Sequence, residues 1–464
     1  MAAALRGLKP MRAITLYTLA AVVAVSIWIS ERVAVPPPKD YRVHITYWEK
    51  WTGFEGDAIR AVVDAFNRSQ DRIHVDLLTV SGIQNKLLLA TAGGTPPDVA
   101  GLWSYLVPQY VDARALTPLD ERCARAGIGP EDYVPVYWRA GVYRGAIYAL
   151  PTTPGSTALH YNRALFREVG LDPDRPPRTI EELDAFAEKL TKKRPDGKMV
   201  RVGFMHAEPG WWHWAWGYMF GGRLWDGRDR LTLNCPENLR AYEWIASYSR
   251  KYGARNLQTF KSGLGTLFAS PENGFLCGKV AMEIQGVWMH NFISKYAPQM
   301  TKPTLQWAAA PFPYPADRPD LAGGTMTEAD CVVIPRGARH PDEAFEFIRF
   351  LESQKGMELL CLLQGKHTPL SRVSPEFYAR HPNPYIKLFY ELPRNRTAFA
   401  VPPIGIWPEL RDALTAVFEE VLLEQKTPKQ ALDDVQARMQ PKFEEYLRRI
   451  RLREQAEGRT HRGR

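Results

Sequence analysis

Two periods of apolar side chains organise the segment between residues 42 and 102. Apolar and polar residues alternate as in a strand over residues 42–48 and 73–80, whereas residues 57–67 follow helical spacing. A further helical run ends at GGTPP, residues 93–97, because proline lacks the amide hydrogen and keeps its predecessor extended. Residues 98–102 then predict a short buried strand. This alternation predicts a parallel sheet with right-handed crossovers.

The rest of the chain continues the α/β pattern. We predict a small hairpin at residues 143–150, a crossing segment at 151–154, and strands at 157–161, 202–205 and 280–284. A helix is expected over residues 177–190, with Thr179 as its cap and Glu182 completing a capping box. Residues 337–352 and 407–423 have the apolar stripe of amphipathic helices.

The N-terminus carries a targeting pattern. Residues 1–12 are basic, residues 13–30 are apolar and uncharged, and three prolines at 36–38 form a stiff spacer. Such a pattern is either a cleaved secretory signal or an uncleaved anchor, and the length of the apolar run favours the anchor. Basic residues stay inside, so the rest of the chain is expected outside the cytoplasm, tethered to the inner membrane or secreted after cleavage.

Size and charge limit the function classes. A chain of 464 residues is longer than the length at which a single hydrophobic core stops growing, so we expect two domains. The formal charge is +9, but the N-terminal residues and the tail, residues 448–464, carry most of it. The nearly neutral body argues against a nucleic-acid partner. We expect a monomer whose basic tail is a solvated, frayed helix end; binding of the tail to anionic lipid or nucleic acid is the alternative.

The cysteines predict neither a metal nor a redox site. None stands in a C-x-x-C pair or beside a histidine at ligand spacing. We expect most of them to be small buried hydrophobic residues. One disulfide between Cys235 and Cys277 is the alternative.

Aromatic residues follow several predicted strands. Trp103 comes just after a strand, where open α/β sheets bind ligands. The WEKW segment, residues 48–51, should emerge at the same edge, and we choose Trp48 and Glu49 from it. Residues 208–218 hold four tryptophans directly after another strand. Flat aromatic rings can stack on the apolar C–H faces of sugars, and carboxylates can accept hydrogen bonds from sugar hydroxyls. We choose Trp211 and Trp212, with Glu208 as a hydrogen-bond acceptor; packing of these tryptophans in the core is the alternative.

Several segments in order resemble a known family. They are LLLATAGGTPPDVAGLW, YRGAIYALPTT, ALHYNRALFREVGLDP, MEIQGVWMHNF, VVIPRGARHPDEAFEFIRFL and TPKQALDDVQ. Over residues 41–447 the chain is similar to family 1 extracellular solute-binding proteins of ABC sugar importers, the group that contains maltose-binding protein. This resemblance implies a two-lobe periplasmic-binding-protein fold with a hinge of crossing segments.

The resemblance also implies lobe boundaries. After residues 1–40, the signal or anchor with its spacer, residues 41–150 and 301–352 would form the first lobe. Residues 151–300 and 353–447 would form the second, followed by the tail.

Further site residues follow from the same likeness. The family places a stacking tryptophan at Trp288, where Gly286 after the strand would let the backbone approach a ligand. Trp407 matches another stacking aromatic, and the pair Gly323 and Gly324 matches glycines that line the cleft. The remaining candidates are weaker: Tyr161 of the YN motif, whose Asn162 is rather a helix cap, and the acids Glu328 and Asp330.

The predicted function is capture rather than catalysis. No G-x-S-x-G elbow, P-loop, G-x-G-x-x-G after a strand or H-E-x-x-H is present, so we expect no enzyme, no cofactor and no metal. We expect an extracytoplasmic protein that binds a mono- or oligosaccharide and delivers it to the transmembrane subunits of an ABC permease. The alternatives are a glycoside hydrolase with two carboxylates and a ligand-free envelope interaction protein.

Overall fold

The computed structural model describes residues 41–265 and 268–462, and side chains as far as residue 455. The elements discussed here belong to one compact unit that begins at His44. No helix within the described residues is long and apolar enough to cross a membrane. The predicted anchor, residues 13–30, lies outside the described residues.

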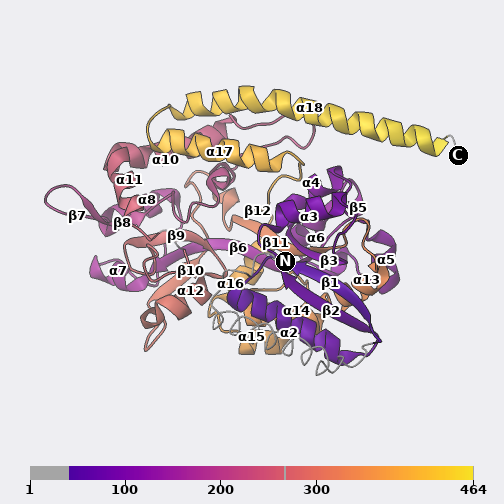
Figure 1. Ribbon diagram of the computed structural model, residues 1–464. Helices are drawn as coiled ribbons and strands as arrows, with labels where there is room; N and C mark the ends of the chain where they lie inside the picture. Colours follow the sequence, from indigo (N-terminus) through magenta and orange to yellow (C-terminus); the bar gives the residue numbers. More distant parts are fainter. Residues whose placement is uncertain (1–40, 266–267, 463–464) are drawn as a thin grey trace, which may run out of the picture. The chain divides into compact units, whose positions relative to one another are not determined.

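A mixed sheet of ten strands runs through this unit (Figure 1). Its order is β2-β1-β3-β11-β6-β9-β8-β7, with β10 beside β6 and β12 beside β11. The strands are β1 (Val43–Glu49), β2 (Ile73–Thr79), β3 (Val99–Trp103), β6 (Leu150–Asn162), β7 (Lys192–Lys193), β8 (Met199–Phe204), β9 (Val280–Gly286), β10 (Trp307–Ala310), β11 (Thr325–Val333) and β12 (Ala398–Phe399). The predicted hairpin is the separate pair β4 (Val142–Tyr143) and β5 (Ala146–Ile147).

Strand β6 connects two lobes. Its first part pairs antiparallel with β11, and its second part pairs antiparallel with β9. Residues 151–154, predicted as a crossing segment, do cross between the lobes, but as part of this strand. The expectation of a separate short strand at residues 157–161 was wrong, because residues 150–162 form one buried strand. Pro151 and Pro154 cannot donate to a ladder. They pair with the part of β11 where the register shifts between Ala329 and Cys331, so an irregularity accommodates them.

The lobes are two sheet halves, each with its own helices. The helices of ten or more residues are α2 (Gly53–Ser69), α3 (Ile83–Ala92), α8 (Ile180–Leu190), α10 (Pro236–Tyr252), α13 (Pro341–Leu351), α14 (Gln354–Gln364), α17 (Trp407–Leu422) and α18 (Pro428–Arg462). The shorter ones are α4 (Val107–Asp112), α5 (Asp120–Ala126), α6 (Pro135–Gly141), α7 (Arg163–Glu168), α9 (Trp216–Met219), α11 (Ala254–Ser262), α12 (Met289–Tyr296), α15 (Pro375–Arg380) and α16 (Ile386–Glu391).

Each lobe buries its own apolar side chains. In the first lobe Leu87 of α3, Leu102 of β3 and Tyr110 of α4 share one cluster. In the second lobe a larger cluster joins strand β8 to helices α8, α10 and α17, and includes Phe204 and Phe418. The predicted parallel β1–β3 pair is present, with Tyr47 opposite Val99. These features confirm the two-lobe α/β fold.

Two local details differ from the sequence-based predictions: the lobe to which β10 belongs and the cap of helix α8. Strand β10 pairs with the second part of β6, so residues 307–310 lie in the second lobe although we had grouped residues 301–352 with the first. The Thr179 side chain caps α8 as expected, accepting from the Glu182 amide. The Glu182 carboxylate, however, accepts from Arg178 N rather than from Thr179, so only half of the capping box forms.

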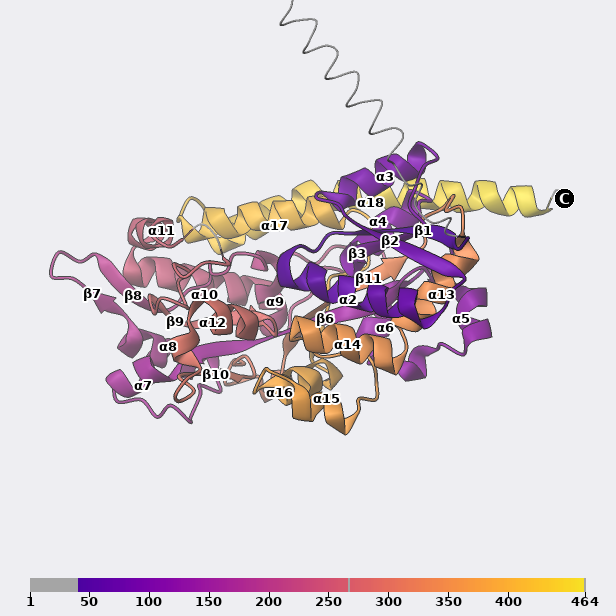
Figure 2. The same cartoon turned by 60° about the horizontal axis from the view of Figure 1, so that its bottom comes forward.

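The C-terminal helix α18 runs along α17 and continues past it (Figures 1 and 2). Its apolar side chains, including Phe443, belong to the second-lobe cluster. No break occurs at residue 448, where we had placed the start of the tail. Arg453 of this segment donates a 2.8 Å hydrogen bond to the Asp112 carbonyl. The first residues of the predicted tail therefore contact the first lobe instead of being entirely solvated.

All five cysteines are free thiols. Cys123, Cys331 and Cys361 are buried, as expected for small hydrophobic residues, whereas Cys235 is partly exposed and Cys277 is exposed. The alternative of a disulfide between Cys235 and Cys277 is therefore not realised.

Candidate functional site

A cavity of about 560 Å³ lies between the two lobes, above the strands that join them. This volume is in the range of pockets that enclose small ligands. Its floor comes from β6 and β11, and most of its wall is aromatic. The aromatic lining residues are Trp51, Trp103, Tyr105, Trp211, Trp212, Trp214, Trp288, Phe292 and Trp407.

The first-lobe wall is a compact aromatic group. Trp51 follows β1 and meets Trp103, at the end of β3, edge to face with ring centroids 6.2 Å apart. Tyr105 stacks on Trp103 with ring centroids 6.0 Å apart. The Lys50 ammonium lies 5.1 Å from the centroids of both tryptophan rings. Because β1 and β3 are parallel neighbours, their carboxyl ends bring these rings together.

The second-lobe wall includes a group of three tryptophans in mutual contact. Trp212 is perpendicular to Trp211 at 5.5 Å and tilted against Trp288 at 6.0 Å. Trp211 is 44% exposed, which is high for so large an apolar side chain. A protein gains stability by burying such a ring, so an exposed tryptophan beside a cavity is a strong candidate for ligand contact.

The sequence places two glycines around Trp288. A Cβ on Gly286 would lie 2.3 Å from the indole, and one on Gly155 of β6 would lie 2.7 Å from it. Gln285 accepts a 3.0 Å hydrogen bond from the indole nitrogen. Gly286 therefore gives room to the Trp288 ring, a steric role that the sequence had not predicted.

The cavity floor carries a buried ion network centred on Asp330 of β11. Its carboxylate contacts Lys50 Nζ at 3.0 Å and Lys366 Nζ at 3.7 Å. It also accepts hydrogen bonds from Thr153 Oγ1 at 2.7 Å and Trp51 Nε1 at 3.0 Å. Burial alone would raise the pKa of Asp330, but the two lysines hold it below its ordinary value. Asp330 is therefore an anion that fixes Trp51.

Lys366 is fully engaged by acids. Its ammonium lies 2.9 Å from Glu55 as well as close to Asp330. Burial would lower the pKa of Lys366, but Glu55 and Asp330 raise it above the ordinary value. The lysine thus remains charged, and its charge is already neutralised inside the protein.

Glu328 also lies on the cavity floor, but its carboxylate has no partner in this ion network. Within the described part of the chain no group donates a hydrogen bond to its carboxylate, and no cation lies within ion-pair distance. Burial and the neighbouring Asp330 raise the pKa of Glu328 to about 7. A carboxyl group in this state can accept or donate a hydrogen bond to a ligand hydroxyl near neutral pH.

The cavity contains several of the predicted site residues. Trp103, Trp211, Trp212 and Trp288 all line it. Trp407 also reaches its lining, but it is only 1% exposed and packs edge to face on Trp214 at 5.0 Å. Its position is that of a core residue behind the wall.

Trp48 and Glu49 do not reach the cavity. Side chains alternate along β1, and Trp48 packs against the first-lobe cluster. Glu49 is 4% exposed and accepts hydrogen bonds from Tyr47 Oη at 2.6 Å and the Lys50 amide at 2.7 Å. The prediction that β1 leads to the cavity is correct, but the residue that enters the cavity is Trp51, just beyond the end of β1.

Four other predicted residues also lie outside the cavity. Tyr161 is buried and donates to the Pro173 carbonyl, while Asn162 caps α7 as expected. Glu208 lies behind Trp212 at a separate, much smaller cavity, where burial raises its pKa above the ordinary value. Gly323 and Gly324 precede β11, and Gly323 O accepts from Asn395 instead.

Three charged residues that were not predicted also line the cavity: Lys366, Glu55 and Arg411. Glu55 is in the first turn of α2, and Arg411 is in α17. Lys366 follows α14, more than 300 residues from its partner Glu55. No local pattern distinguishes these charged residues from solvated ones. Trp51 belongs to the WEKW segment expected at this edge, but the sequence did not show which of its side chains enters the cavity.

Comparison with known proteins gives one family match. The family described as bacterial extracellular solute-binding protein matches residues 54–358. Among curated relatives, the sn-glycerol-3-phosphate-binding periplasmic protein UgpB of Pectobacterium atrosepticum is 22% identical over 412 residues, covering 84% of this chain and 88% of the relative.

Solved structures agree with the fold. The structure described as CpMnBP1 with mannobiose bound has a TM-score of 0.73 and 28% identity, covering 85% of this chain and 99% of that chain. The sugar-binding protein MalE from Xanthomonas citri has a TM-score of 0.72 and 19% identity, covering 89% of this chain and 100% of that chain.

Proposed function

The chain belongs to the bacterial extracellular solute-binding proteins, and we propose that its cleft captures a carbohydrate for delivery to an ABC permease. The protein acts outside the cytoplasm. The observation that carries the choice of carbohydrate is the pair of tryptophan walls, Trp51 with Trp103 and Trp212 with Trp288, on opposite lobes of one cavity. Such rings stack on the C–H faces of sugars, and the floor supplies polar groups for hydroxyls.

The charges of the floor favour a neutral sugar over a phosphate ester. Lys366 is already paired with Glu55 and Asp330, and Glu328 adds a further acid without a basic partner. A phosphate would meet this acid at short range, and the two cations of the lining, Lys366 and Arg411, already have acidic partners. The CpMnBP1 structure with mannobiose supports the same choice, whereas the name of UgpB points to sn-glycerol-3-phosphate as the competing ligand.

Ligand capture works by lobe closure in this proposal. Phe54 of α2 and Phe292 of α12 meet edge to face at 6.4 Å, joining one residue of each lobe beside the cavity. A sugar that contacts both walls stabilises the closed arrangement by the difference between its affinities for the closed and open forms. We assign the lobes as residues 44–150 with β11 and α13, and residues 157–310 with α17 and α18, joined by the middle of β6.

No chemical step is part of this function. Glu208, which could serve as an acid in a hydrolase, lies in a separate small cavity behind Trp212. Of the three carboxyl groups that line the cleft, Asp330 and Glu55 are held by lysines, so Glu328 has no second unpaired acid beside it to complete a hydrolytic pair. We therefore expect a bound oligosaccharide to be released intact.

Residues 13–30 would tether the protein to the inner membrane beside its permease. Fractionation of cells that express the full chain tests this part. A protein found in the membrane pellet and released only by detergent supports the tether, whereas a soluble protein whose first residue lies near position 30 contradicts it.

A glycan array followed by calorimetry tests the carbohydrate proposal. The purified protein should bind a neutral mono- or oligosaccharide, and chromatography after long incubation should recover that sugar unchanged. Tighter binding of sn-glycerol-3-phosphate than of any neutral sugar would overturn the ligand class. Sugar hydrolysis that Glu208→Gln abolishes would overturn the assignment as a binding protein.

A further inference from the structure

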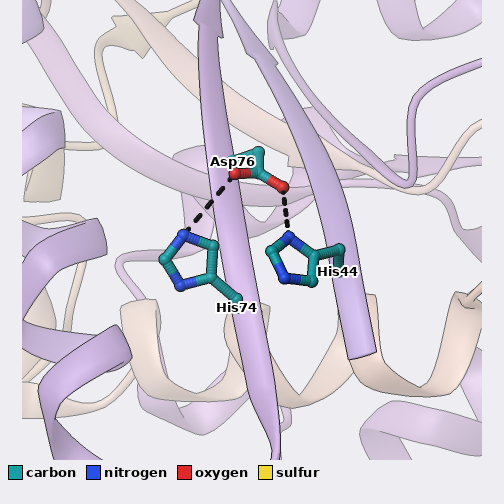
Figure 3. A group of neighbouring side chains, drawn as sticks. All are labelled: His44, His74 and Asp76. Carbon is teal, nitrogen blue, oxygen red and sulfur yellow. Dashed lines mark hydrogen bonds and ion pairs between the residues drawn. The ribbon is translucent and has the colours of Figure 1, made fainter. Parts of the chain in front are cut away.

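Two histidines and an aspartate meet on the first lobe, away from the cavity (Figure 3). His44 belongs to β1, and His74 and Asp76 belong to the neighbouring strand β2. Residues 74 and 76 share one face of β2 because side chains alternate along a strand. Ile45, Ile73 and Val75 next to them are buried, so this alternation holds the three polar side chains on the outer face.

The Asp76 carboxylate lies between the two rings. One oxygen is 2.9 Å from His44 Nδ1, and the other is 3.5 Å from His74 Nε2. The ring centroids are 4.9 Å apart. One candidate ligand atom from each residue lies within 4.8 Å of the others. Ligands of a tetrahedral ion with bonds of about 2.0–2.1 Å lie about 3.3 Å apart, so small side-chain rotations would bring these atoms to one ion.

We propose that His44, His74 and Asp76 form a binding site for a divalent transition-metal ion, with Zn²⁺ as the reference ion. Two imidazoles and one carboxylate are the donor set that zinc accepts. Calcium and magnesium require more oxygen ligands than this group offers. Three protein ligands leave a fourth position for water or for a donor from another molecule.

The position of the site determines which part of the protein a bound metal stabilises. His44 is near the start of β1, whereas the cavity lies beyond its end, and five residues of strand span about 17 Å. A metal at this place links β1 to β2 and stabilises the first lobe without contacting the sugar. Metal binding and sugar binding are therefore expected to be independent, and this proposal does not rest on the identity of the cleft ligand.

Calorimetry with ZnCl₂ on the chelator-treated full-length protein, in detergent and free of any histidine tag, tests the site. One ion should bind per chain and raise the melting temperature. Co²⁺ should bind in its place and give the visible absorption of a tetrahedral complex. His74→Ala and Asp76→Asn should each weaken Zn²⁺ binding at least about tenfold and remove the cobalt band, because each change deletes one of three ligands.

His340→Ala is the matched control, since it removes a histidine of the first lobe outside this group and should leave metal binding unchanged. The three site residues are partly exposed, so the variants should retain the circular dichroism and sugar affinity of the parent protein. Equal Zn²⁺ affinity in His74→Ala and the parent, or no cobalt band in the parent, would overturn the proposal.

Discussion

The hydroxyl of Tyr446 on α18 donates a 2.6 Å hydrogen bond to the carboxylate of Asp112 at the end of α4. Tyr143 lies 2.9 Å from the same hydroxyl, and Arg144 forms a 2.9 Å ion pair with Asp112. Because α18 packs in the core of the second lobe, whereas Asp112, Tyr143 and Arg144 belong to the first, these contacts connect the lobes independently of β6. Burial raises the pKa of Asp112 above its ordinary value, so its carboxyl group depends on these donors.

Tyr446→Phe should weaken sugar binding about fivefold to tenfold without touching the cavity. The change removes a hydrogen bond to an acid, which contributes on the order of 1 kcal/mol, and this bond favours the arrangement in which both walls face one cavity. Calorimetry measures the affinity. Tyr161→Phe is the matched control, since its hydroxyl bonds within the second lobe. Equal affinities of the two variants would contradict the connection between lobes.

Trp288→Ala should lower sugar affinity roughly fivefold to hundredfold, because a lost stacking ring costs about 1–3 kcal/mol. Trp307→Ala gives the opposite pattern: that ring is fully buried, and its loss should cost about 3–5 kcal/mol of unfolding free energy. Denaturant unfolding and calorimetry on both variants separate the two roles. A large loss of stability in Trp288→Ala with unchanged affinity would remove Trp288 from the site.

Gly286→Ala should also weaken sugar binding, because the new methyl group would lie 2.3 Å from the Trp288 ring and force it to move. We expect a loss of about tenfold or more, similar to that of Trp288→Ala, and a shift in tryptophan fluorescence. Gly263→Ala is the control, since its nearest neighbour is 3.4 Å away. Unchanged affinity in Gly286→Ala would show that the Trp288 ring position does not determine binding.

Glu328 should make stability depend on pH. Its pKa is raised from 4.5 to about 7 by burial and by Asp330, so the folded state binds the proton more tightly than the unfolded state. The stability that this protonation provides is fully present below about pH 4.5 and is lost as pH rises through about 7. Glu328→Gln should therefore gain stability relative to the parent protein across this window. Urea unfolding at several pH values measures the difference, and a difference that does not change with pH would contradict the assignment.

Much of the fold was predictable because it depends on local patterns. The GGTPP cluster ends α3, and the chain then continues as the extended strand β3. Trp103 is the last residue of that strand and lines the cavity. The amphipathic stripes of α13 and α17 predicted both helices to within a few residues. Strand β6 was predicted less well, since its prolines argue against a strand and the register shift of β11 opposite them is a tertiary feature.

The sequence by itself determined the α/β architecture, the family and four tryptophans of the cleft, because strand ends and aromatic clusters are local features. These four are Trp103, Trp211, Trp212 and Trp288. The tertiary structure alone decided which neighbouring side chain enters the cavity: Trp51 does, whereas Trp48 and Glu49 do not. It also paired Lys366 with Glu55, and Tyr446 with Asp112, across more than 300 residues each. Such pairs depend on the packing of whole lobes, and no spacing along the chain encodes them.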